Sequence, residues 1–239
     1  MKVGVTLPQF RSDPGAALSA AVAAESAGNI DGVFVFDHLW AIGQPDRPAL
    51  SAWPLLGALA QRTERVVLGT LVARVGLLPD AVLGHHVATM LRVVGGDRFV
   101  AGLGAGDRLS KPENEAYGVA FPPVTERVRQ LRACAHLCLS AGAEVWIGGR
   151  HHEIVDVASD LGVARNLWAV EPSEVGAVAA TGAEVTWGGI VADHAEGAEA
   201  LLRSIRDAGA SWCVLAPAFR PGEPPEQAIK TISAAVAAA

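Results

Sequence analysis

Residues 33–38 read Val-Phe-Val-Phe-Asp-His, so an aspartate and a histidine directly follow a short apolar run. The run is β-branched and aromatic, which is typical of a strand that is buried on both faces. Strands of this kind belong to parallel α/β folds, which place their chemistry at the carboxyl ends of the strands. Asp37 and His38 therefore indicate an active site at one such end.

Similar apolar runs recur along the whole chain. We expect strands at residues 3–7, 32–36, 66–72, 99–103, 144–147, 166–170, 184–190 and 212–216. Amphipathic stretches alternate with them and predict helices at residues 14–27, 49–62, 80–94, 123–141, 151–161, 172–180, 195–208 and 224–238. Eight strands alternating with eight helices predict an α/β fold with a parallel sheet, and eight strands close a (β/α)8 TIM barrel.

Proline and glycine support these boundaries. Pro14 and Pro172 stand at the first position of their predicted helices, where a missing N–H is tolerated. Glycines follow five of the helices, at positions 28, 142, 162, 182 and 209, where a left-handed C-cap is expected. Because no linker or change of composition divides the chain, we expect one domain over residues 1–239.

The composition argues against several classes of protein. The formal net charge is -6 and the arginines are scattered, so we expect no nucleic-acid partner. No apolar stretch approaches the roughly 20 residues of a membrane helix, and the first residues show no signal-peptide pattern. Cys134, Cys138 and Cys213 have no paired spacing, which favours a reducing, cytoplasmic location.

No residue cluster in the sequence predicts a metal site. Cys134 and Cys138 share one helix face without a nearby third ligand, so we interpret them as core thiols. The pairs at positions 85–86 and 151–152 are adjacent histidines, which diverge on a helix and lack a carboxylate motif.

Three strand ends carry candidate site residues. Asp37 and His38 serve as a proton donor or cofactor contact in one interpretation; in the other, Asp37 caps a turn and His38 packs on Trp40. The sequence Gly-Leu-Gly-Ala-Gly-Asp at residues 102–107 either supports a ligand on its backbone or forms a ligand-free turn. A long connection at residues 104–122 follows it, and loops of that length are usually functional or mobile.

A third candidate lies at residues 148–150, Gly-Gly-Arg, at the end of the fifth predicted strand. Backbone N–H groups at a helix start, with the guanidinium of Arg150 beside them, suit an anion. The alternative is a turn that needs glycine, with Arg150 in solvent.

The ordered set of motifs resembles the bacterial luciferase-like monooxygenase superfamily, in particular its deazaflavin branch that uses coenzyme F420. The landmarks are Asp37-His38, residues 53–65, 68–72, 102–107 and 113–118, Arg127, and residues 145–149. The resemblance implies a luciferase-like TIM barrel that holds a flavin-type ring at the carboxyl ends of its strands. It also implies a bulge after the third strand, often with a non-prolyl cis peptide, which matches the Leu71–Val72 bond here.

The resemblance also implies roles for individual residues. His38 and Asp107 would act in catalysis, His38 near the reactive ring carbon and Asp107 on the substrate or the ring. The implied cofactor contacts are Asp37, Thr70, Leu71, Val72, Gly104, Ser110, Gly148, Gly149 and Arg150.

The leading hypothesis is therefore a coenzyme F420-dependent oxidoreductase that moves a hydride between the deazaflavin and a small organic substrate. An FMN-dependent monooxygenase and a non-catalytic flavin-binding barrel are the alternatives, since both cofactors carry a ring and a phosphate. The resemblance further implies a homodimer.

Overall fold

Eight parallel strands close into a barrel in the computed structural model, which describes residues 1–191, 195–220 and 222–239. They are β1 (Lys2–Thr6), β2 (Gly32–Val35), β5 (Val67–Thr70), β7 (Phe99–Gly104), β8 (Glu144–Gly148), β9 (Ala164–Trp168), β10 (Val185–Ile190) and β11 (Trp212–Ala216). Hydrogen bonds join them in the order β5-β2-β1-β11-β10-β9-β8-β7, and pairing of β5 with β7 closes the ring. The predicted (β/α)8 TIM barrel is confirmed.

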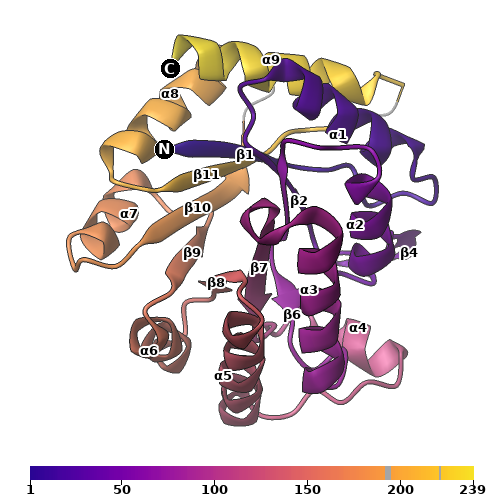
Figure 1. The fold of residues 1–239 in the computed structure, drawn as a ribbon, viewed down its shortest axis with the longest axis vertical. Coiled ribbons are helices and arrows are strands. Elements are labelled where there is room, and N and C mark those ends of the chain that lie inside the picture. Colours follow the sequence, from indigo (N-terminus) through magenta and orange to yellow (C-terminus); the bar gives the residue numbers. More distant parts are fainter. Residues whose placement is uncertain (192–194, 221) are drawn as a thin grey trace.

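Helices follow the barrel strands and cover the outside of the barrel (Figure 1). They are α1 (Gly15–Ala27), α2 (Ala52–Ala60), α3 (Asp80–Val94), α5 (Val124–Ser140), α6 (His152–Leu161), α7 (Pro172–Ala179), α8 (Ala195–Asp207) and α9 (Pro225–Ala238). Each corresponds to a helix expected from the sequence. Gly28 and Gly162 cap α1 and α6 with positive φ angles of 79° and 62°, as the C-cap pattern predicts.

The additional elements lie mostly after the strands, at the carboxyl end of the barrel. A hairpin of β3 (Trp40–Ala41) and β4 (Gln44–Pro48) follows β2, and a short strand β6 (Ala73–Arg74) follows β5. The loop predicted after β7 contains the helix α4 (Lys111–Ala116). A 3-10 turn, η1 (Gly96–Arg98), precedes β7 on the other side. The carboxyl end is thus the elaborated end of the barrel.

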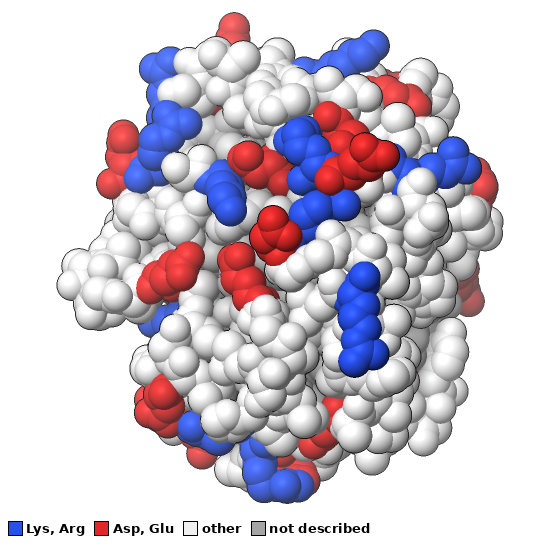
Figure 2. Space-filling view, in the orientation of Figure 1, with Lys and Arg blue, Asp and Glu red and all other residues white. Residues whose placement is uncertain are grey.

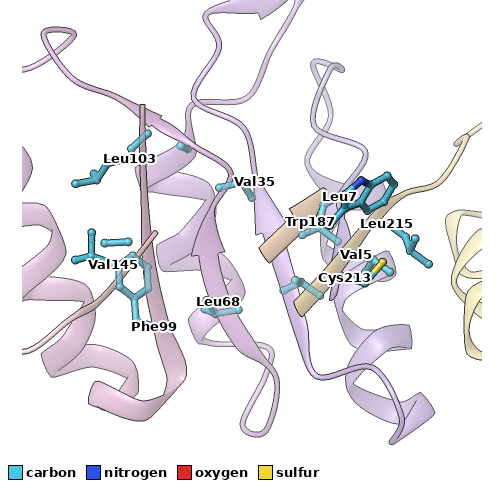
Figure 3. Packing of buried hydrophobic residues seen from close by; sticks show 14 of the residues in the cluster. Val5, Leu7, Val35, Leu68, Phe99, Leu103, Val145, Trp187, Cys213 and Leu215 are labelled. Atoms are coloured by element: carbon cyan, nitrogen blue, oxygen red, sulfur yellow. The ribbon is translucent and has the colours of Figure 1, made fainter. Parts of the chain in front are cut away.

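Apolar side chains fill the layer between the strands and the helices. Figure 3 shows part of it, with Val5, Val35, Leu68 and Leu215 on four of the strands. Cys134 and Cys138 belong to this buried cluster, as the sequence predicts for small core thiols, and Cys213 lies in it as well. Burial raises the pKa of both Cys138 and Cys213 to about 12, so these thiols stay protonated at neutral pH.

Aromatic side chains fill the inside of the barrel. Phe34 stacks on Trp146 with ring centroids 5.2 Å apart, and Trp212 meets both rings edge-on, at 5.7 and 5.4 Å. Glycines on the flanking strands leave room for these rings, because a Cβ at Gly4 or Gly69 would approach Phe34 to 2.6 Å. Large rings opposite glycines therefore fill the interior of the barrel beneath the carboxyl ends of its strands.

A bulge follows β5 and enters the barrel. The Leu71–Val72 peptide bond is cis, as the family resemblance implies. Gly102 and Gly104 on β7 accommodate this bulge: a Cβ at Gly102 would overlap the carbonyl oxygen of Thr70, and one at Gly104 would lie 2.5 Å from Val72. The alternating glycines of the Gly-Leu-Gly run therefore serve strand packing first.

Charged side chains of both signs are interleaved on the face of the protein shown in Figure 2. Exposed ion pairs include Arg132 with Asp160 and Arg150 with Glu174, at 2.7 and 2.8 Å. Pairs of this kind contribute at most about 1 kcal/mol each. Among the helices that the structure describes, we find none with the length and apolar character needed to cross a bilayer.

The close approach of the Thr70 backbone to Gly102 predicts that a single added methyl group strongly destabilises the protein. Gly102→Ala should lower the free energy of unfolding by about 3 kcal/mol or more, because the added Cβ meets backbone that cannot turn aside. Gly57→Ala is the matched control: it lies in α2 with nothing within 4 Å of its Cβ and should stabilise by about 0.5–1 kcal/mol. Urea unfolding measures both, and equal effects of the two substitutions would contradict this packing.

Candidate active site

A cavity of about 670 Å³ opens at the carboxyl ends of the barrel strands. All eight strands contribute to its wall, at or directly after their last residues. The contributing residues, in chain order, include Thr6, Phe36, Leu71, Gly104, Gly148, Trp168, Ile190 and Ala216. Its volume lies within the range of about 300–1,000 Å³ that is usual for small-molecule sites.

Nine of the eleven predicted site residues line this cavity. They are Asp37, His38, Leu71, Val72, Gly104, Asp107, Ser110, Gly148 and Gly149. The structure thus brings together residues from the ends of β2, β5, β7 and β8, which are far apart in the sequence. Their roles in binding and catalysis stay predictions.

The other two expected cofactor contacts, Thr70 and Arg150, are not among the residues that line the cavity, and each has a partner within the protein. The Thr70 side chain is fully buried, and its Oγ1 donates a hydrogen bond of 2.7 Å to the carbonyl oxygen of Gly102. The Arg150 guanidinium is exposed and donates to both carboxylate oxygens of Glu174 on α7, at 3.0 and 2.8 Å. Thr70 is used to tie the bulge to β7, and the charge of Arg150 is turned toward the outer surface.

His38 is held by a buried carboxylate that sequence reasoning did not single out. Its Nδ1 lies 2.7 Å from Oε1 of Glu113, a residue of α4 that is only 1% exposed. The second oxygen of Glu113 accepts the N–H of Leu39 and an N–H of Arg74, both at 2.8 Å. Two segments of the chain, His38-Leu39 and Arg74, therefore converge on one carboxylate of a third.

Arg74 extends this network to the neighbouring strand end. Its side chain is buried and donates to the carbonyl oxygen of Ser110 at 3.1 Å, in addition to Glu113. Its backbone N–H donates to the carboxylate of Asp37 at 3.1 Å. The four ionisable residues Asp37, His38, Arg74 and Glu113 thus form a continuous polar network, and all but Glu113 line the cavity.

Opposing influences set the pKa values of the two carboxyl groups. For Glu113, burial raises the pKa, but the hydrogen bonds from His38 and Leu39 and the charge-assisted bond from Arg74 outweigh it and lower the pKa below its ordinary value. For Asp37, burial dominates and raises the pKa, although the Arg74 backbone bond and positive charge oppose the shift. Glu113 is therefore ionised at neutral pH and accepts the proton that His38 carries on Nδ1.

Asp107 lies on the cavity wall, where its exposed side chain shapes the turn into α4. Its Oδ1 accepts the backbone N–H groups of Leu109 and Ser110, at 2.8 and 3.1 Å. This is the geometry of an aspartate that organises the start of a helical segment. The structure gives Asp107 a local backbone role, and its predicted part in proton transfer is a separate proposal.

Aromatic rings border the imidazole of His38. Phe10 stacks on Phe36 with ring centroids 5.7 Å apart, and Trp168 meets Phe36 edge-on at the same distance. The centroids of Phe10 and Phe36 lie 6.3 and 6.5 Å from that of His38. The sequence does not show that these rings meet, because Phe10 lies in the loop after β1, Phe36 directly follows β2 and Trp168 ends β9.

Three histidines of the two adjacent pairs pack against other rings. His86 packs against Trp53 with ring centroids 5.1 Å apart, and the rings of His151 and His152 stack on each other at 4.5 Å. The part of the chain that the structure describes contains no group of three or more histidine, cysteine or acidic side chains placed to hold a metal ion.

Comparison with known proteins identifies relatives for most of the chain. Residues 1–187 match the family described as luciferase-like monooxygenase. A protein of Nakamurella multipartita named F420-dependent glucose-6-phosphate dehydrogenase is 35% identical over 131 residues, which are 54% of this chain and 36% of that protein. A protein of the same name from Beutenbergia cavernae is 37% identical over 143 residues, 58% of this chain and 41% of its own length. The matched segment spans less than half of these relatives.

Solved structures show the same fold along the chain. An F420-dependent secondary alcohol dehydrogenase, in complex with an F420-acetone adduct, superposes with a TM-score of 0.77 and 16% identity, over 98% of both chains. The coenzyme F420-dependent tetrahydromethanopterin reductase of Methanopyrus kandleri superposes with a TM-score of 0.70 and 12% identity, over 97% of both chains. At such identities the similarity establishes the fold.

The network around Glu113 predicts a large loss of stability when its charge is removed. Glu113→Gln should lower the free energy of unfolding by roughly 3–5 kcal/mol, because it leaves the buried guanidinium of Arg74 without its carboxylate. Glu115→Gln is the control on the same helix: its pair with Lys111 is exposed, so its effect should stay within about 1 kcal/mol. We call the contacts of Glu113 with His38, Leu39 and Arg74 the clamp. Chemical denaturation at neutral pH measures the stability of both variants, and a loss below about 1 kcal/mol for Glu113→Gln would refute the clamp.

The same network predicts a pH dependence with a definite sign. Because folding lowers the pKa of Glu113, its stabilisation is complete above the ordinary glutamate value of 4.5 and is lost as the pH falls through the folded-state pKa. The difference in stability between the natural protein and Glu113→Gln should therefore shrink in acid. Unfolding curves recorded from neutral pH downward measure it, and a constant difference would contradict the shifted pKa.

Proposed function

The chain belongs to the luciferase-like monooxygenase family, and we propose that it is an oxidoreductase that moves a hydride between coenzyme F420 and a small organic substrate. One observation carries this proposal: the clamped imidazole of His38 faces the same cavity as the Leu71–Val72 bulge and the backbone of Gly104, Gly148 and Gly149. The names of the curated relatives support the deazaflavin over other redox cofactors.

The cavity suits a flat ring with an anionic tail. Leu71 and Val72 offer apolar surface, and Gly148 and Gly149 leave backbone without side chains at the wall. A Cβ at Gly149 would lie 2.9 Å from Ile154, so the glycine also lets the chain pass closely over the first turn of α6. These residues would hold the ring and its phosphate, with Ser110 and Asp37 as further polar contacts. When bound, the deazaflavin supplies a two-electron hydride acceptor or donor.

His38 would handle the proton that accompanies hydride transfer. Glu113 occupies Nδ1, which fixes the tautomer and leaves Nε2 for exchange with the substrate. Buried support of this kind keeps an imidazole in one orientation, as proton transfer requires. Asp107 lies on the same wall, and we propose it as a second group that acts on the substrate.

We also propose a homodimer, a single domain over residues 1–239 and a cytoplasmic location. The first follows from the family resemblance, and the second from the unbroken alternation of strands and helices that forms the barrel. The third is supported by three buried cysteine thiols that form no disulfide. Light scattering should give twice the chain mass of 24.7 kDa.

Cofactor titration tests the proposed function directly. Coenzyme F420 should change its fluorescence on binding with micromolar or tighter affinity, whereas FMN should bind at least tenfold more weakly. His38→Ala should keep this binding and lose turnover, because its imidazole moves a proton. Arg150→Ala should bind as the natural protein does, since Arg150 pairs with Glu174 outside the cavity. Absence of any response to F420 would refute the assignment, and preferential FMN binding would favour the monooxygenase alternative.

A further inference from the structure

Large apolar side chains are exposed around the mouth of the cavity. Ile42, Leu109, Trp168 and Ile190 are 48%, 58%, 40% and 77% exposed, and all four line it. They come from separate places: the turn between β3 and β4, the loop before α4, and the ends of β9 and β10. Exposed apolar side chains that gather from distant segments at one opening mark a surface that an apolar ligand covers.

The apolar surface continues inward to the imidazole. Trp168 lies at the mouth and also meets Phe36 edge-on, and Phe36 stacks on Phe10. Both phenyl rings lie beside His38. A ligand that follows these rings from the mouth thus passes over hydrocarbon until it reaches the imidazole of His38.

Several polar side chains of the wall are already engaged by the protein. Gln9 is fully buried, donates to the carbonyl oxygens of Phe36 and Leu50, and accepts the N–H of Phe36. Arg74 is bound to Glu113 and Ser110. Gln9 and Arg74 therefore offer a polyhydroxylated ligand few replacements for the hydration that it would lose beside them.

Two further arginines lie on the wall, and each is tied to backbone. Arg11 donates to the carbonyl oxygen of Phe219 at 3.1 Å, and Arg47 donates to that of Phe10 at 3.1 Å. The other N–H groups of these two side chains are donors of the kind that bind a phosphate. The competing possibility is therefore a phosphorylated sugar at this rim. The aromatic path to His38 favours the apolar ligand.

We propose that the substrate is an apolar alcohol or its ketone, with its oxygen at Nε2 of His38 and its hydrocarbon part against Phe36 and Trp168. This rests on the proposed function. In the oxidative direction the carbinol C–H bond breaks and hydrogen leaves with both electrons as hydride to the oxidised deazaflavin. The hydroxyl proton passes to Nε2 of His38, and the C–O single bond becomes a carbonyl.

Binding to the cofactor-free protein is the first test, with cyclohexanone as the apolar probe and glucose 6-phosphate as the polar one. Cyclohexanone should shift the indole N–H signal of Trp168 in NMR spectra, assigned with Trp168→Phe, and the shift should saturate. Ile190→Ser should weaken this binding at least threefold. Val93→Ser is the matched control and should leave binding unchanged. Like Ile190, Val93 is an exposed β-branched apolar residue (50% exposed), but it lies on α3, away from the cavity lining.

Turnover with coenzyme F420 is the second test, with cyclohexanol and glucose 6-phosphate as alternative substrates. Oxidation of cyclohexanol, with no oxidation of the sugar phosphate, supports the proposal. Saturable binding and oxidation of the sugar phosphate alone would overturn it while the proposed function stands. Failure of F420 to bind refutes the proposed function instead. The titration of the cofactor-free protein then still decides the ligand class. A saturable cyclohexanone shift supports an apolar site, and the absence of a shift overturns it.

Discussion

The buried carboxylate of Glu113 is the interaction on which the candidate site depends. It accepts hydrogen bonds from the His38 ring, the Leu39 backbone and the Arg74 guanidinium, so it joins the end of β2 to β6 and α4. A buried guanidinium and a buried carboxylate each need the other, because either alone would lose its hydration without return. The orientation of the imidazole therefore follows from the folding of α4, a helix of six residues.

The barrel beneath explains why the cavity lies where it does. Phe34, Trp146 and Trp212 fill the interior beneath the cavity, and glycines on the neighbouring strands let the rings approach closely. Leu71 belongs to this inner cluster and also lines the cavity, so the bulge after β5 forms the boundary between packed core and open mouth. A ligand at the mouth rests on the core itself, which gives the site a rigid floor.

Much of the fold follows from local sequence pattern, and the clamp does not. Apolar runs and helical spacing predicted every barrel strand, because strands buried on both faces are apolar throughout. The hairpin was missed because β4 is exposed and carries Pro45 and Pro48, which break a strand pattern. Residues 113–118 were noted as a family landmark, but the contact of Glu113 with His38 was missed, because the two residues are 75 positions apart and nothing local in the sequence pairs them. The ion pair of Arg150 was not foreseen, because sequence alone does not show that Glu174 on another helix pairs with it.

Nitrogen NMR of the His38 ring is a direct test of its contact with Glu113. In the natural protein, at a pH where the ring is neutral, the clamp predicts a proton on Nδ1 and a bare Nε2, since an ionised Glu113 accepts only at Nδ1. The Glu115→Gln variant should show the same two shifts, because that residue lies on the exposed side of α4. A proton on Nε2, or rapid averaging between the two nitrogens, would show that Glu113 does not hold the ring in this way.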